Sequence, residues 1–168
     1  MSLERDSGFC IIVYGSHIIN QHINFTIMAK SIRTEIIISA SPEKVWGILT
    51  KFENYPTWNP FIISLEGVVE QGNKITVTIH PPKGKGMVFK PTITEYVKYK
   101  KLSWQGSVLF RGIFDGEHIF ELIDNSNGTV TFIQRENFTG IFSSMFNLDN
   151  TKDGFILMNN KLKELSEY

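Results

Sequence analysis

The period of the hydrophobic pattern changes once along this chain, and that change constrains the fold more than any other feature. Between Ile32 and Phe138, runs of alternating apolar and polar residues are typical of strands with one buried face. After Asn150, apolar residues recur every three or four positions, at Phe155, Met158, Leu162 and Leu165. We therefore predict one α+β domain, in which an antiparallel sheet packs against a long C-terminal helix.

The alternating part divides into several strands and one short helix. The first strand is predicted from Ile32 to Ile38, and Ser41 then precedes Pro42, the order of an N-cap and the first turn of a helix that ends near Thr50. The later strands are predicted at Phe61–Val69, Lys74–His80, Met87–Val97, Lys101–Gly106, Ile113–Ile123 and Thr129–Phe138. Turn-forming segments such as Asp124–Gly128 separate them, which indicates an antiparallel meander.

The overall composition excludes several classes of function. Lys and Arg together number 17, as do Asp and Glu, so no net charge favours a nucleic acid, and we predict no nucleic-acid partner. Cys10 is the only cysteine, so an internal disulfide and a Cys-x-x-Cys metal site are excluded, and a reducing, cytoplasmic location fits best. His17 and His22 alone do not make a metal site. We predict no metal and no cofactor.

The first 30 residues raise a separate question. The apolar segment Phe9–Ile19 is interrupted by Gly15 and follows the acidic Glu4 and Asp6, and it is shorter than the roughly 20 residues that span a bilayer. We therefore expect neither an export signal nor an integral membrane segment. Residues 1–30 are predicted to form an N-terminal arm or extra strand before a domain over residues 31–168, with Met28 as an alternative start.

Two of the predicted strands place polar side chains on an otherwise apolar face. His118 shares a face with Phe120, while Gln134 and Glu136 share one with Phe138. A hairpin centred on the Asp124–Gly128 turn would set His118 opposite Gln134, with Glu136 as a diagonal neighbour. Burial without partners costs roughly 1–3 kcal/mol for each such group, so the three need one another, water or a ligand.

The remaining residues predicted to face inward are large and apolar. Thirteen phenylalanines is a high count for 168 residues. Such rings can pack solid between sheet and helix or line a cavity, and the three polar residues favour a cavity. The predicted ligand-binding residues are His118, Gln134, Glu136, Trp104, Phe120, Phe138, Phe61, Ile63, Met87, Phe89, Phe155 and Met158. The alternative is a filled core in which the polar residues brace the sheet.

Several segments together resemble a known family. They are "ISASPEKVWGILTKFENYPTWNPFI" at Ile38–Ile62, "LSWQG" at Leu102–Gly106, "GEHIFEL" at Gly116–Leu122, "TFIQRENFTG" at Thr131–Gly140 and "GFILMNNKLKEL" at Gly154–Leu165. From Ser31 to Glu164 the chain resembles the START-like, Bet v 1-like (SRPBCC) superfamily, in its polyketide cyclase/dehydrase and lipid-transport branch. The resemblance implies a helix-grip fold: a seven-stranded antiparallel sheet around a long C-terminal helix, with two short helices after strand 1 and a hydrophobic pocket.

Three functions stay open at this point. The first is intracellular binding or carriage of a hydrophobic small molecule, a lipid or a polycyclic or aromatic compound, in the cavity between sheet and helix. The second is a cofactor-free polyketide cyclase or dehydratase that uses His118 or Glu136 as general acid or base. This chain has Gln134 where the family often has a second histidine, which weakens the case for a relay or a metal site. The third is an interaction module with a filled core, forming a homodimer through its N-terminal arm.

Overall fold

The computed structural model describes residues 13–14, 17–18, 29–108, 114–140 and 148–168. The predictions made for Cys10, His22 and Met28 lie outside these residues, as does most of the Phe9–Ile19 segment. In that segment, strand β1 (Val13–Tyr14) pairs antiparallel with β2 (His17–Ile18).

The first helix begins and ends where the sequence predicts. Strand β3 (Ala29–Ile38) leads into α1 (Pro42–Leu49), and the Ser41 side chain caps α1 by accepting a hydrogen bond from the Lys44 backbone N–H at 3.3 Å. Thr50 is the C-cap residue. Both predicted short helices are therefore confirmed, because a 3₁₀ turn η1 (Phe52–Asn54) and α2 (Tyr55–Trp58) follow α1.

The strands form two sheets, which corrects the prediction of seven strands in one sheet. Beyond the β1–β2 pair, the described residues contain eight strands. The larger sheet has the order β3, β10 (Val130–Thr139), β9 (Phe114–Asp124), β8 (Lys101–Val108), β7 (Thr92–Val97), and the smaller one the order β4 (Ile62–Glu66), β5 (Thr76–Ile79), β6 (Met87–Phe89). All pairs in both sheets are antiparallel.

The extra strand arises because the predicted Met87–Val97 strand divides in two. Pro91 follows β6 directly after Lys90, and proline has no backbone N–H to donate to a strand ladder. β6 therefore pairs with β5, whereas β7 pairs with β8 in the other sheet.

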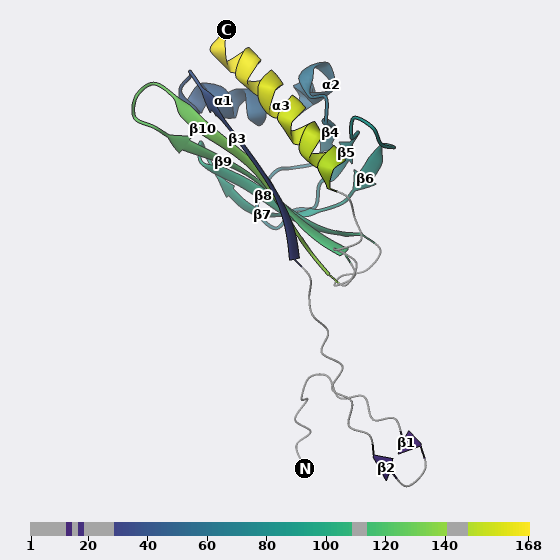
Figure 1. Ribbon diagram of the computed structural model, residues 1–168. Helices are drawn as coiled ribbons and strands as arrows, with labels where there is room; N and C mark the ends of the chain where they lie inside the picture. The colour runs from purple at the N-terminus through teal and green to yellow at the C-terminus, as the bar shows by residue number, and fades with distance from the viewer. Residues whose placement is uncertain (1–12, 15–16, 19–28, 109–113, 141–147) are drawn as a thin grey trace.

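The C-terminal helix α3 (Asp149–Glu167) lies along the larger sheet, with β4, β5 and β6 beside its N-terminal half (Figure 1). Phe155, Met158 and Leu162 are fully buried, as the helical spacing predicts. The helix-grip architecture is thus confirmed, and the space between the two sheets and α3 contains the core. No helix in the described ranges has the length and apolar character needed to cross a bilayer.

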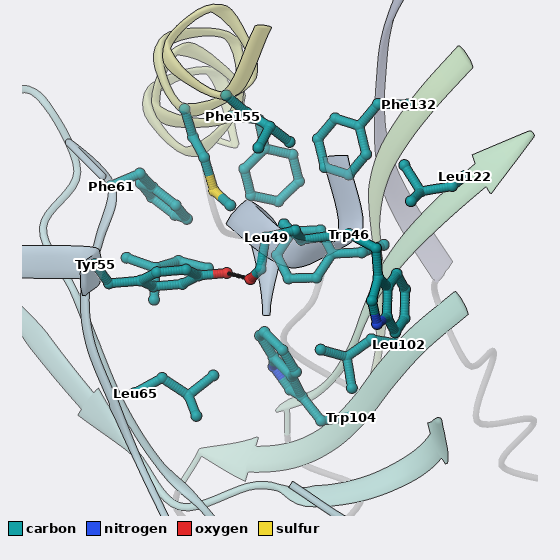
Figure 2. Packing of buried hydrophobic residues seen from close by; sticks show 14 of the residues in the cluster. Trp46, Leu49, Tyr55, Phe61, Leu65, Leu102, Trp104, Leu122, Phe132 and Phe155 are labelled. Atoms are coloured by element: carbon teal, nitrogen blue, oxygen red, sulfur yellow. Dashed lines mark hydrogen bonds between the residues drawn. The ribbon is translucent and has the colours of Figure 1, made fainter. Parts of the chain in front are cut away.

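Aromatic residues fill much of that core (Figure 2). The Phe61 ring meets the Phe155 ring edge to face, with centroids 5.4 Å apart. The buried Tyr55 hydroxyl donates a 2.6 Å hydrogen bond to the Leu49 carbonyl oxygen, drawn dashed in Figure 2, and so ties α2 to the end of α1. Trp46 is buried on the inner stripe of α1.

Candidate functional site

The three predicted polar residues do come together, but in a different register. His118 in β9 lies directly opposite Glu136 in β10, and Gln134 lies opposite Phe120. The predicted pairing of His118 with Gln134 is therefore wrong. The reason is the hairpin turn: the Asn125 N–H donates to the Thr129 carbonyl oxygen at 3.1 Å, and Asp124 pairs with Val130, so the turn is Asn125–Thr129, one residue further along the chain than the predicted Asp124–Gly128.

Both ring nitrogens of His118 are occupied. Its Nδ1 lies 3.0 Å from Glu136 Oε2, and its Nε2 lies 3.3 Å from Gln134 Nε2. Because a carboxylate accepts hydrogen bonds, the Nδ1–H donates to Glu136, and the Nε2 lone pair then accepts from the Gln134 amide. This chain of two hydrogen bonds fixes the imidazole as the Nδ1–H tautomer and leaves no free lone pair on the ring.

Aromatic rings hold His118 in place. Trp104, its neighbour on β8, stacks on the imidazole with centroids 4.7 Å apart and an interplanar angle of 7°. Phe120 and Phe155 meet the imidazole edge to face, at 4.6 Å and 5.1 Å. His118 is only 3% exposed. Its orientation, and with it the position of the Glu136 carboxylate, is therefore set by packing as well as by hydrogen bonds.

A cavity of about 380 Å³ lies beside this cluster, within the size range of small-molecule sites. The larger sheet contributes the inner face of β8, β9 and β10, and the smaller sheet contributes β4, β5 and β6. The loop between β5 and β6 and the start of α3 complete the lining. The lining residues are Phe61, Ile62, Val77, Ile79, Pro81, Gly84, Lys85, Met87, Phe89, Pro91, Trp104, Gly106, Gly116, His118, Glu136, Phe138, Leu148, Asn150 and Thr151.

The predicted site residues divide into three groups. Those that line the cavity are Phe61, Met87, Phe89, Trp104, His118, Glu136 and Phe138. Those buried outside the lining are Phe120, Gln134, Phe155 and Met158. Ile63 faces outward and is 37% exposed, so the prediction that it faces inward is wrong. A bulge between Ile62 and Ser64 breaks the alternation and turns Ile62 to the cavity instead.

Two glycines at the cavity wall are site residues that the sequence prediction missed. Gly106 in β8 pairs with Gly116 in β9, and both line the cavity. A Cβ on Gly116 would stand 2.8 Å from Glu136 Oε1, so a side chain there would collide with the carboxylate. Glycine inside a strand often marks such a close approach, so the two glycines within predicted strands could have indicated these site residues from the sequence.

The loop between β5 and β6 packs on the start of α3. The Lys83 N–H donates to Asn150 Oδ1 at 3.0 Å, and the Lys83 ammonium lies 4.0 Å from Asp153. Pro81 in this loop is buried. The loop thereby forms one side of the cavity, with Lys85 as the cation in its lining. In the described part of the chain, no three His, Cys, Asp or Glu side chains gather as a metal site would require.

The family described as polyketide cyclase / dehydrase and lipid transport matches residues 29–152, which is most of the chain. The chain belongs to this family. Membership supports a domain that binds hydrophobic ligands. A search of curated proteins by sequence found no match.

Solved structures share the fold at low sequence identity. A hypothetical protein from Helicobacter pylori has a TM-score of 0.66 and 14% identity over 82% of this chain and 88% of that one. A point mutant of norcoclaurine synthase from Thalictrum flavum, in complex with a transition-state analogue, has a TM-score of 0.61 and 11% identity over 84% of this chain and 96% of that one. Ara h 8.0201 has a TM-score of 0.59 and 16% identity over 83% of this chain and 96% of that one. These similarities confirm the Bet v 1-like fold.

Proposed function

We propose that the protein binds or carries a hydrophobic small molecule, such as a lipid or a polycyclic or aromatic compound, in the cavity between its sheets and α3. The observation that carries this proposal is the Glu136 carboxylate, 20% exposed, in a lining made mainly of apolar side chains. A few placed polar groups in an apolar pocket are typical of sites that orient a small ligand.

The hydrogen bonds of His118 favour binding over acid–base catalysis by the imidazole. A general base needs a free lone pair within reach of the substrate, and the Nε2 lone pair is already occupied by the Gln134 amide. His118 serves in this proposal as the residue that positions Glu136. The cyclase or dehydratase alternative and the exchange of the N-terminal arm in a homodimer both stay predictions.

A titration with the neutral apolar fluorophore N-phenyl-1-naphthylamine tests the proposal. Ile79 lines the cavity, whereas Ile123 lies on the outer face of the larger sheet and is 45% exposed. The Ile79→Trp variant should reduce the cavity and weaken probe binding, and the Ile123→Trp control should bind as the wild type does. Thermal unfolding checks that both variants fold.

Either of two results would overturn the proposal. One is the absence of saturable probe binding to the wild type. The other is equal binding by the wild type and a folded Ile79→Trp variant, since the probe would then lie outside the cavity.

A further inference from the structure

The two oxygen atoms of Glu136 have different surroundings. Oε2 accepts the hydrogen bond from His118 Nδ1 at 3.0 Å. Oε1 lies over Gly116 on the cavity side, at the position 2.8 Å from where a Cβ would stand. Among the described residues, no hydrogen-bond donor contacts Oε1. One lone-pair-bearing, negatively charged oxygen is thus presented at the cavity wall.

This carboxylate is held in place before any ligand binds. His118 cannot turn away from Glu136, because Gln134 bonds its other nitrogen and Trp104 stacks on its face. An acceptor fixed in this way loses little conformational freedom when a donor arrives, which favours ligands that supply one. A ligand carboxylate at the same place would instead meet a like charge in a site of low dielectric.

The wall next to Oε1 carries two aromatic side chains. Gly106 and Gly116 pair across β8 and β9, and Phe138 is the partner of Gly116 on β10. Pro91 covers Gly106, since a Cβ there would lie 3.3 Å from Pro91 Cβ, and Glu136 covers Gly116. Trp104 stands on the other side of Gly106 along β8, separated from it by Gln105. Trp104 and Phe138 both line the cavity, so an aromatic ring of a ligand can pack on them beside the carboxylate.

Building on the function proposed above, we propose that the ligand is a hydrophobic aromatic molecule with a hydroxyl or ammonium group that donates to Glu136 Oε1. The site discriminates against ligands of the same shape that carry a carboxylate. Glu136 and Gly116 together determine this specificity: Glu136 supplies the acceptor, and Gly116 supplies the space in which it sits.

Displacement of N-phenyl-1-naphthylamine by four matched compounds tests the inference: 2-naphthylmethanol, 2-naphthylmethylamine, 2-methylnaphthalene and 2-naphthoic acid. We expect the alcohol or the amine to displace the probe at a concentration about tenfold lower than the acid needs. The concentration of 2-methylnaphthalene needed for displacement should lie between those of the donor compounds and the acid. Whichever of the alcohol and the amine displaces the probe at the lower concentration identifies the donor as hydroxyl or ammonium.

Two variants assign the effect to the carboxylate. In Glu136→Gln the amide oxygen still accepts from His118 Nδ1, but the cavity side gains an N–H donor, so the preference over the acid should disappear. Gly116→Ala displaces Oε1 without a change in charge and should weaken alcohol binding while probe binding persists. The control Glu117→Gln removes a charge from the opposite face of β9, where Glu117 accepts from Asn137, and should keep the wild-type preference.

The inference fails if the probe binds saturably and the wild type shows no preference among the alcohol, the amine and the acid. It also fails if folded Glu136→Gln and Gly116→Ala variants both keep the preference. Both results leave the proposed function intact, whereas the absence of probe binding would refute the proposed function itself.

Discussion

Gly154 in α3 is the position at which one added methyl group should cost the most. An ideal Cβ built on Gly154 would have three ring atoms of Phe61 within 2.9 Å, closer than real Cβ contacts come. The Phe61 ring is 2% exposed and packs edge to face on Phe155, so it has little room to move. Figure 2 shows Phe61 and Phe155 close together beneath the helix.

Two opposing effects determine the stability of a Gly154→Ala variant. Alanine in a helix interior is favoured over glycine by about 1 kcal/mol. Overpacking of a closed core typically costs about 1–3 kcal/mol, and the number of close ring atoms puts this site at the upper end of that range. We therefore expect the free energy of unfolding to fall by about 1–2 kcal/mol.

Gly47 in α1 provides the matched control. A Cβ at Gly47 meets no atom within 4 Å, so Gly47→Ala should gain stability from helix propensity alone, by about 0.5–1 kcal/mol. The assay is urea denaturation of both variants, with the slope m checked for a constant two-state transition. The shift in midpoint should have opposite signs in the two variants.

A Gly154→Ala variant as stable as the wild type, beside a stabilised Gly47→Ala, would show that the Phe61 ring can move aside at little cost. Combination with Phe61→Leu gives a further check. The smaller side chain should relieve the collision, so the double variant should be more stable than the sum of the two single effects predicts.

Two other positions give further predictions. Tyr55→Phe removes the buried hydrogen bond to the Leu49 carbonyl oxygen and should lower the free energy of unfolding by about 1–3 kcal/mol; an unchanged urea midpoint would contradict this. Burial also raises the pKa of the Tyr55 phenol above its ordinary value. Because the pKa is raised in the folded state, the protonated phenol contributes to the stability of the fold. That contribution is complete below pH about 10, the ordinary pKa of tyrosine, and is lost as the pH rises further. Unfolding midpoints measured between pH 9 and pH 11 should therefore fall less in Tyr55→Phe than in the wild type, and parallel curves would exclude the mechanism. Ser41→Ala removes the α1 N-cap and should cost about 1 kcal/mol in the same urea assay, whereas no loss would mean that the cap contributes nothing.

Local features of the fold could be predicted because local residues determine them. The Ser41 cap and its proline set the start of α1, and the spacing of Phe155, Met158 and Leu162 identified the buried side of α3. The failures were also local in origin. Side-chain and backbone bonds at Asn125 and Thr129 set the hairpin register, and alternation alone does not reveal their effect.

The candidate site could be predicted only in part, because it depends on how two sheets face each other. His118 and Glu136 were recognisable as polar residues on an apolar face, and their direct contact follows from the observed register. Ile79 and Leu148, in contrast, line the cavity through the placement of β5 and α3, which no sequence period encodes. Ile63 was misplaced because a bulge shifts the alternation within β4.

The position of a bound apolar molecule tests binding in the cavity most directly. NMR with ¹³C-labelled methyl groups of Met and Ile can measure nuclear Overhauser effects between those methyls and N-phenyl-1-naphthylamine. We expect contacts to Met87 and Ile79, which line the cavity, and none to Ile37 and Ile123 on the outer face of the larger sheet. Contacts to Ile37 or Ile123, with none to Met87 and Ile79, would contradict binding in the cavity.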